Sequence, residues 1–184
     1  MSLVEFYLQV LDTFEKNKVE YLVVGGHAVN FHGYVRATLD MDLWVNNTDN
    51  NLDNLFKALI HLGFNEDTCK DAVQFFKDNH IISIPNDKLK INLLDSFIIK
   101  ENFIDSYKNH ETLTINQIQI KVVGLEDLMN IKYKSNRTKD MLDLKELKIL
   151  KYIRNQEKPN SDFKIPSSDK INDDHKNTDK GLSM

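Results

Sequence analysis

The chain has 184 residues, enough for one domain with a small helical annex, and 41% of them are hydrophobic, enough for a packed core. No apolar run approaches the roughly 20 residues that cross a bilayer, and acids in the N-terminal stretch argue against a signal peptide. The single cysteine, Cys69, excludes an intramolecular disulfide and a cysteine-based zinc site. We therefore expect a cytoplasmic protein with no membrane partner.

The formal net charge of −4 is unevenly distributed along the chain. Residues 1–120 carry 10 Lys or Arg and 17 Asp or Glu, whereas residues 121–158 carry 10 and 6. A protein that grips a long duplex usually shows a stronger basic excess. The charge balance leaves a short nucleic acid or a nucleotide alone open as the ligand.

The chain begins with a predicted amphipathic helix within residues 1–21, whose apolar stripe consists of Leu3, Phe6, Tyr7, Val10, Leu11 and Phe14. A short apolar strand over 21–24 follows and runs into a tight turn at Gly25-Gly26. A short helix over 27–34 then leads to a second strand over 39–45, in which apolar residues alternate with Asp40, Asp42 and Trp44.

The remaining predicted elements are helices over about 50–62, 66–78, 101–108, 125–134 and 138–154 and strands over 80–84, 88–94 and 113–123, the last a strand pair that turns at Asn116-Gln117. This order predicts an α/β (α+β) fold, with a small mixed sheet flanked by helices and further helices at the C-terminal end. The predicted domain spans 1–154, with a core at about 20–123 and a helical part at 124–154. The polar tail, residues 155–184, is predicted to be disordered.

Two acids stand close together in Asp40-Met41-Asp42. Residues two apart on a strand point to the same side, with Cα atoms roughly 6.5–7 Å apart. Carboxylates this close repel each other unless a cation neutralises them, and hard oxygen ligands suit Mg²⁺ (or Mn²⁺). The motif alone is weak, because an exposed strand face explains it as well.

Gly25-Gly26 strengthens the metal interpretation through its order and spacing. Two glycines between a strand and a helix let the backbone approach a ligand closely, and a helix N-terminus offers free N–H groups to phosphate. The return of the chain places Asp40 and Asp42 beside this turn. Amides that bind phosphate and carboxylates that bind metal would then share one edge of the sheet.

This segment, residues 21–45, resembles the DNA polymerase beta-type nucleotidyltransferase superfamily, whose signature is an apolar strand, Gly-Gly or Gly-Ser, and a later Asp-x-Asp or Asp-x-Glu. Arg36 and Thr38 match a pattern of its small prokaryotic members. Gly124 to Lys132 and Arg137 to Leu144 resemble the Lys and Asp motifs of AbiEii-type toxins and their relatives, so the chain looks AbiEii-like or MNT-like.

The resemblance implies a metal-dependent enzyme that moves a nucleoside monophosphate from a nucleoside triphosphate to a hydroxyl group and releases pyrophosphate. The acceptor it implies is an RNA or tRNA end, a small molecule or a protein, and a toxin-like member has an antitoxin protein as a partner. The implied site consists of the catalytic Asp40, Asp42, Lys132 and Asp140, the nucleotide-binding Gly25, Gly26, His27, Arg36, Thr38 and Arg137, and the metal ligands Asp40, Asp42 and Asn92.

Asn92 departs from the superfamily pattern, which usually has a third carboxylate there. An asparagine offers one carbonyl oxygen but brings no charge and cannot act as a general base. Asp95 could replace it only if the strand ends or bulges there. A second interpretation is therefore a catalytically weak nucleotide-binding or regulatory module, and a third is an adaptor without a ligand.

Several of these residues have structural alternatives. Lys132 and Arg137 either neutralise phosphate or form a solvated basic helix face. Asp140 and Asp143 share a helix face, where they hold those cations, activate a nucleophile, or, for Asp140, only complement the helix N-terminus.

Three further side chains have two interpretations each. Arg36 either steadies a phosphate or pairs with Asp40. His27 either touches a nucleotide or packs in the interior. Trp44 either stacks on a base or is buried in the core, which is the more common case.

Overall fold

The computed structural model of the chain describes residues 2–86 and 89–156. Its strands are β1 (Tyr21–Val24), β2 (Met41–Val45), β3 (Ile81–Asn86), β4 (Leu89–Leu94), β5 (Glu111–Ile115) and β6 (Ile118–Val122). They form one sheet in the order β3-β4-β2-β1-β6-β5. β1 runs parallel to β6 and β2 parallel to β4, whereas the other neighbours are antiparallel. The predicted small mixed sheet is confirmed.

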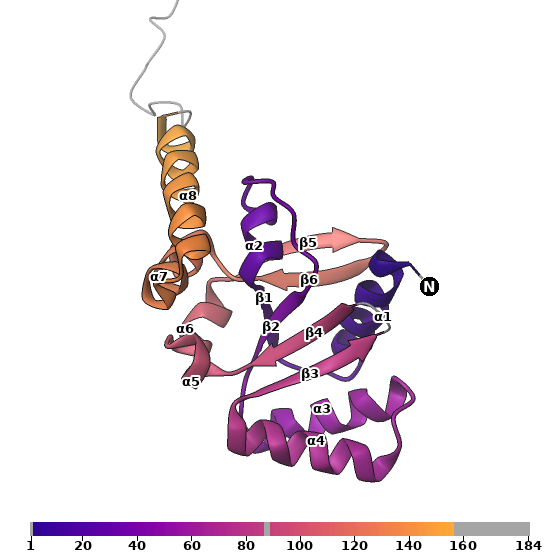
Figure 1. Ribbon diagram of the computed structural model, residues 1–184. Helices are drawn as coiled ribbons and strands as arrows, with labels where there is room; N and C mark the ends of the chain where they lie inside the picture. The colour runs from indigo at the N-terminus through magenta and orange to yellow at the C-terminus, as the bar shows by residue number, and fades with distance from the viewer. Residues whose placement is uncertain (1, 87–88, 157–184) are drawn as a thin grey trace, which may run out of the picture.

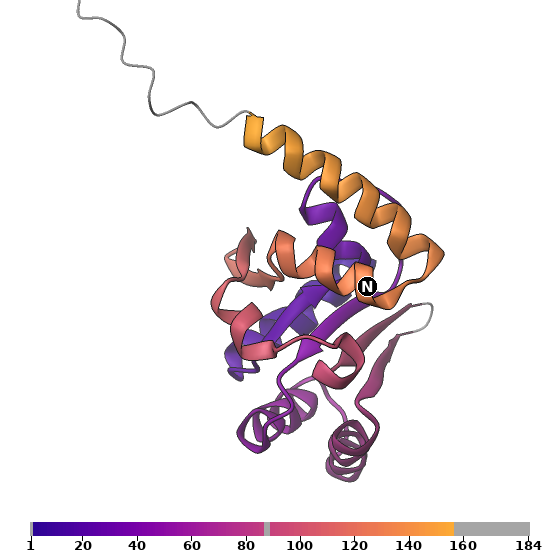
Figure 2. The same ribbon diagram turned by 90° about the vertical axis from the view of Figure 1, so that its left-hand side faces the viewer.

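The helices are α1 (Leu3–Lys16), α2 (Gly25–Phe31), α3 (Asp49–His61), α4 (Glu66–Asn79), α5 (Ser96–Ile99), α6 (Phe103–Lys108), α7 (Leu125–Ser135) and α8 (Thr138–Gln156). α1 packs against β6, and α3 lies against both α1 and α4. Figure 1 shows α3 and α4 on one side of the sheet, with α7 and α8 on the other. Figure 2 shows the length of α8, which runs past the body of the protein.

The N-terminal helix forms for the reasons that its sequence indicates. Ser2 caps it, with a reciprocal bond between the Ser2 hydroxyl and the Glu5 backbone and between the Glu5 carboxylate and the Ser2 backbone. The described part of the predicted apolar stripe is buried, namely Phe6, Tyr7, Val10, Leu11 and Phe14. Burial of this stripe against the sheet fixes the layer behind the site.

The central strands β1 and β2 are buried on both faces, so packing holds in place the end of β2 that carries Asp42. Trp44 is fully buried, its indole N–H donates to Ser96 Oγ at 3.3 Å, and its ring meets Phe103 edge to face. Trp44 is therefore a core residue, and its interpretation as a stacking platform for a base is wrong. Asp42, two residues earlier, lies on the same face at the uncovered end of the strand.

Element boundaries differ from the predictions at three places near the site. β2 begins at Met41 rather than Leu39, so Asp40 precedes the strand and Leu39 is exposed. α2 begins at Gly25, so the two glycines are its first residues rather than a turn before it. The four-residue α5 was not predicted, since Asp95 starts it as a local N-cap that strand periodicity does not reveal.

Other boundaries reflect local turn and edge chemistry. β3 continues through Pro85 because it is an edge strand, where the missing proline N–H costs no ladder bond. Asn116 and Gln117 both have positive φ and join β5 to β6, which confirms the predicted turn.

The chain end is described only in part. α8 extends the predicted helix to Gln156. The rest of the predicted tail, residues 157–184, lies outside the described part, and the domain limits stay a prediction. Within residues 2–86 and 89–156, no helix combines the length and apolarity needed to cross a bilayer.

Candidate functional site

Three neighbouring strands bring the first site residues together. Asp42 on β2 lies opposite Val24, the last residue of β1, and opposite Asn92 on β4. The Asn92 side-chain amide donates to Asp42 Oδ1 at 2.8 Å. The Asn92 carbonyl oxygen in turn accepts a hydrogen bond from Ser83 Oγ at 2.8 Å. The Asp42 carboxylate is therefore held against β4, by Asn92.

Neighbouring side chains lie so close to the backbone of Gly25 and Gly26 that neither position has room for a Cβ atom. A Cβ on Gly25 would lie 2.2 Å from Asp42 Oδ2, and Gly25 also has a φ of +64°, a conformation that side chains rarely adopt. A Cβ on Gly26 would lie 2.4 Å from Thr38 Oγ1 and 3.0 Å from Arg36 Nη1. The start of α2 is thus packed against Asp42 on one side and against the loop before β2 on the other.

The loop before β2 is anchored through both the backbone and the side chain of Arg36. The Asn30 side chain accepts from the Arg36 N–H at 2.9 Å and donates to the Arg36 carbonyl at 3.0 Å. The guanidinium forms a two-bond fork with Asp143 on α8, through Nε at 2.6 Å and Nη2 at 2.8 Å. The interpretation that Arg36 pairs with Asp40 is therefore wrong, and Asp40 instead has Lys90 Nζ at 4.0 Å.

A buried ion cluster joins α7 to α8 behind this loop. Lys132 Nζ lies 2.5 Å from Asp140 Oδ1 and 2.9 Å from Asp143 Oδ2. Lys132, Asp140 and Asp143 are all buried. The interpretation of Lys132 as part of a solvated basic face is wrong, because its ammonium is enclosed by two carboxylates. Its catalytic assignment stays a prediction, and its observed contacts fix the α7–α8 corner.

Asp140 is the most strongly stabilised carboxylate of the cluster. Burial raises the pKa of its carboxyl, but bonds from Lys132, Ser135 and Arg137 and the charge of Lys132 outweigh burial and lower the pKa to about 2. A base is effective when its pKa lies near the working pH. Asp140 therefore orients the cations around it and is poorly suited to activate a nucleophile.

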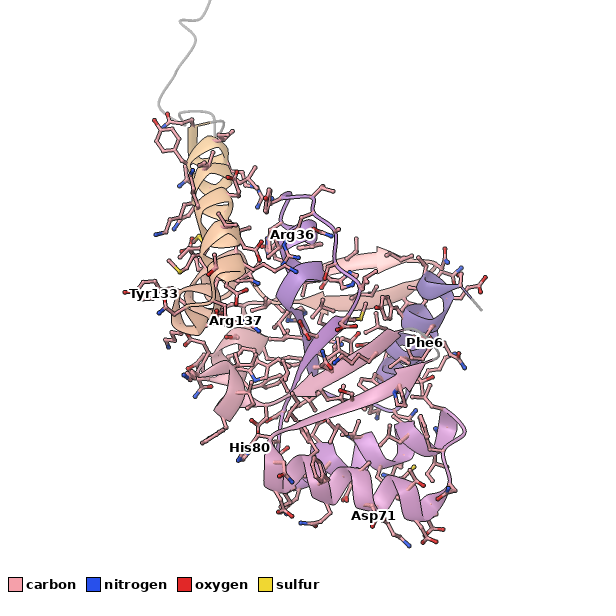
Figure 3. All side chains as sticks on the ribbon, viewed as in Figure 1. Phe6, Arg36, Asp71, His80, Tyr133 and Arg137 are labelled. Atoms are coloured by element: carbon pink, nitrogen blue, oxygen red, sulfur yellow. The ribbon has the colours of Figure 1, made fainter. Side chains whose placement is uncertain are left out.

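One cleft, about 570 Å³ in volume, collects most of the predicted site residues. It is lined by Gly26, Arg36, Ala37, Thr38, Leu39, Asp40, Asp42, Asn92, Arg137, Lys139 and Asp140. Asp40 and Asp42 therefore face one space, although only Asp42 belongs to the strand. Figure 3 shows Arg36 and Arg137 on the side of the sheet where α7 and α8 lie.

The cleft has acidic and basic walls. The Arg137 side chain is 78% exposed, and among the residues that the structure describes only Asp140 binds it, through Oδ2 to Nε at 2.7 Å. Lys139 is exposed and forms no ion pair within the described part of the chain. Asp40 and Asp42 line the same cleft as these two cations. The arrangement suits a ligand that carries several negative charges together with a cation of its own.

Three predicted residues do not line the cleft: Gly25, His27 and Lys132. Burial lowers the pKa of His27, while the nearby Asp42 raises it and Arg36 lowers it further. His27 meets Tyr7 edge to face and lines an apolar hollow beside α1. It fits the packing interpretation, as a neutral ring.

Asp95 is not an alternative to Asn92. It caps α5, accepting the Phe97 N–H at 2.9 Å, and its other oxygen binds His80 Nδ1 and Asn47 Nδ2, each at 2.7 Å. Asp95 lies just beyond the C-terminal end of β4, and these three contacts occupy both of its carboxylate oxygens. Asp95 is a structural residue.

The donor set fits a hard divalent ion only if a ligand completes it. Residues 2–86 and 89–156 contain no group of three or more His, Cys, Asp or Glu that could hold a metal. The cleft offers the carboxylates of Asp40 and Asp42, and Asn92 would add an oxygen by turning its amide over and giving up its bond from Ser83. Phosphate oxygens and water complete such a shell in many magnesium sites.

Sequence reasoning missed three residues that shape the cleft: Asn30, Ser135 and Lys139. Asn30 resembles any polar residue near a helix end, so its two hydrogen bonds to the Arg36 backbone are visible only in three dimensions. Ser135 lies two residues before the Arg137 to Leu144 motif and Lys139 lies within it, and that proximity is the one signal that could have identified them.

One family of known proteins matches most of the chain. Residues 4–177 match the sequence model of the family described as "Nucleotidyl transferase of unknown function (DUF2204)". A search of the curated proteins finds no match. Among solved structures, an antigenic nucleotidyltransferase-like protein from Paracoccidioides brasiliensis is similar, at 15% identity and a TM-score of 0.47, covering 79% of this chain and 76% of that one. A likeness at this level carries no functional argument.

The close approach of Gly25 to Asp42 predicts the effect of adding a single methyl group. Gly25→Ala should destabilise the protein by about 1–3 kcal/mol through overpacking, in addition to about 1–2 kcal/mol of left-handed backbone strain. Gly63→Ala is the matched control, because Gly63 also has positive φ but nothing lies within 4 Å of its Cβ position. Urea denaturation of both variants measures the difference. Equal losses would mean that Gly25 does not press on Asp42.

The low pKa of Asp140 predicts acid sensitivity. A folded-state pKa of about 2 against an ordinary 3.8 stabilises the fold above pH 4, and this stabilisation is lost as the pH falls towards 2. The free energy of unfolding of the wild type should therefore fall by about 2 kcal/mol more than that of Asp140→Asn over this range. Denaturation at pH 5, 4, 3 and 2 checks it. Parallel losses in the two proteins would contradict the assigned bonds.

Proposed function

Because this chain belongs to the family of nucleotidyl transferases of unknown function (DUF2204), we propose that it transfers a nucleoside monophosphate from a nucleoside triphosphate to a hydroxyl group. The observation that carries the proposal is the Asp42 carboxylate, held between Gly25 and Asn92 in a cleft that also presents Asp40, Arg137 and Lys139. Acids beside exposed cations suit a metal-bound polyphosphate.

In the proposed reaction, the acceptor hydroxyl oxygen forms a bond to the α-phosphorus while the bond between that phosphorus and the bridging oxygen breaks. Pyrophosphate leaves, and the hydroxyl proton passes to water. Mg²⁺ or Mn²⁺, when bound, would screen the charge of the phosphates. Asp40 and Asp42 are the residues that would hold it, with Asn92 as a neutral third ligand.

The chain's own residues act mainly by position and charge, since phosphoryl transfer needs little covalent help. Arg137 and Lys139 would bind the leaving pyrophosphate, Arg137 through its free guanidinium nitrogens. Asp140 would keep Arg137 aimed into the cleft. Asp143 would keep Arg36 and its loop against Gly26, which holds Thr38 at the cleft wall.

The finer identity is part of the same proposal. The Lys132 and Asp140 motifs favour an AbiEii-like or MNT-like member, and such a toxin-like protein would have an antitoxin protein as a partner. The excess of Lys and Arg in residues 121–158 favours an RNA or tRNA end over a neutral acceptor. A cytoplasmic location is in keeping with both.

The proposal predicts that Asp42→Asn loses transfer. Replacement by the isosteric amide removes the charge that holds the cation, so transfer of labelled nucleotide to total RNA or to lysate should fall on the order of 100-fold. Asp53→Asn on the exposed surface of α3 is the control and should retain activity. Screening four labelled nucleoside triphosphates with Mg²⁺ measures both.

Other outcomes of that screen separate the rival interpretations. A thermal shift with nucleotide and Mg²⁺ but no transfer would support a nucleotide-binding or regulatory module. No shift and no transfer by the folded wild type would contradict the proposed function.

The substitution Asn92→Asp should preserve or raise transfer activity rather than abolish it. A carboxylate there would face Asp42 across the bond that is now 2.8 Å long, so the protein without metal should be destabilised by repulsion. Mg²⁺ should restore its melting temperature, and turnover should be preserved or raised. Thermal melts with and without Mg²⁺, together with the transfer assay, measure this. Loss of transfer in a folded variant would mean that Asn92 does not occupy the third ligand position.

A further inference from the structure

A second hollow, about 400 Å³ in volume, adjoins the cleft and shares Asp42, Asn92 and Arg137 with it. We call it the second chamber. The two spaces otherwise have different walls: the first is bounded by α2 and the loop before β2, the second by α5, α7, β3 and β4. In Figure 3, Arg137 appears between Arg36, on the wall of the first cleft, and His80, next to the second chamber.

The position of the second chamber fits the attacking side of the proposed reaction. In an in-line displacement the attacking and leaving oxygens lie on opposite sides of the phosphorus. The first cleft offers Lys139 and the loop before β2 to the leaving pyrophosphate. With the α-phosphate at Asp42, the second chamber is then the space from which a hydroxyl oxygen can approach.

The lining of the second chamber carries more positive than negative side chains, which favours an anionic ligand. Asp42 is the only carboxylate in its described lining, against Lys100, Lys134 and Arg137. Lys134 lies 2.8 Å from Glu101 and is largely compensated. Lys100 is exposed and forms no ion pair within the described residues, and Arg137 has its terminal nitrogens unengaged. A cationic acceptor such as an aminosugar would meet the exposed ammonium of Lys100 and the exposed guanidinium of Arg137 there.

Apart from Ser135 and the shared Asn92, the remaining lining is apolar, and an aromatic residue adjoins it in sequence. Ile81 and Ile98 are 41% and 42% exposed at its walls. Phe97, next to Ile98, is 69% exposed and stacks on His80 with ring centroids 4.4 Å apart. Exposed aromatic rings next to cations are the usual platform for a base and its phosphate.

From these features we infer that the second chamber binds the acceptor and that this acceptor is a phosphorylated nucleoside with a free hydroxyl group. Its phosphate would bind Lys100 and Arg137, and its base would lie against Ile98 and Phe97. The same chemistry occurs at the end of an RNA strand and in a free mononucleotide. The inference rests on the proposed function, because it takes the first cleft as the site of the triphosphate.

The test is a binding measurement without nucleoside triphosphate or metal, so that no reaction occurs. Fluorescence anisotropy follows a short single-stranded RNA labelled at its 5′ end, and unlabelled nucleoside monophosphates compete with it. Lys100→Glu and Ile98→Asp should each weaken binding about tenfold, as expected when one charge-assisted contact is lost or opposed. Lys57→Glu makes the same charge change on the exposed surface of α3 and should bind within twofold of the wild type.

The same variants are melted with a nucleoside triphosphate and Mg²⁺, and all three should keep the wild-type thermal shift. Competition by monophosphates at affinities equal to that of RNA identifies a free nucleotide as the acceptor, whereas weak competition identifies an RNA end. The inference is overturned if Lys100→Glu and Ile98→Asp bind as the wild type does, or if the wild type binds neither ligand. It is also overturned if these variants lose the triphosphate shift, since the chamber would then hold the donor nucleotide. A wild type with no triphosphate shift contradicts the proposed function instead.

Discussion

The contact between the backbone of Gly25 and the carboxylate of Asp42 is the constraint on which the rest of the site depends. It leaves no room for a side chain at Gly25 and fixes the distance between the start of α2 and the second residue of β2. Asn92 closes the other side of the same carboxylate through its amide. Asp42 therefore has little freedom, and it faces the cleft before any ligand arrives, which is the preorganisation that electrostatic catalysis requires.

The buried ion cluster extends this rigidity to the basic wall. Lys132, Asp140 and Asp143 are enclosed between α7 and α8, and burial of three charges is tolerable only because each has close partners. Through Asp143 the cluster holds Arg36, and through Asp140 it holds Arg137. The residues that resemble a family motif in sequence thus act, in this geometry, largely as a frame for two arginines.

The sequence was sufficient for the features that depend on local pattern. The sequence predicted α3, α4, α7 and α8 to within about two residues, the buried stripe of α1, and the turn at Asn116-Gln117. The order of Gly25-Gly26 and Asp40-Met41-Asp42 predicted that these residues share one space, and Asp40, Asp42 and Gly26 do line one cleft.

Contacts between residues that are far apart in the sequence could not be predicted when several partners were available. Arg36 had Asp40 as its nearest acid in sequence, but Asp143, more than a hundred residues later, offers both oxygens in a fork that the exposed Asp40 does not. For Lys132 the sequence left two alternatives open, a solvated helix face or a pairing with Asp140 and Asp143, and only the three-dimensional structure decides for the pairing. The same limit hid Asn30, and it hid the second chamber, whose walls come from five separate elements.

The central claim is that Asp42 and its neighbours hold a divalent cation against the phosphates of a nucleotide. A crystal structure with Mn²⁺ and a non-hydrolysable nucleoside triphosphate analogue tests it most directly, because the anomalous signal of Mn²⁺ marks the ion independently of the phosphates. The account predicts a Mn²⁺ peak bound by Asp42 and Asp40, with the polyphosphate extending towards Arg137 and Lys139. A nucleotide bound elsewhere, or a Mn²⁺ peak away from both acids, would contradict it.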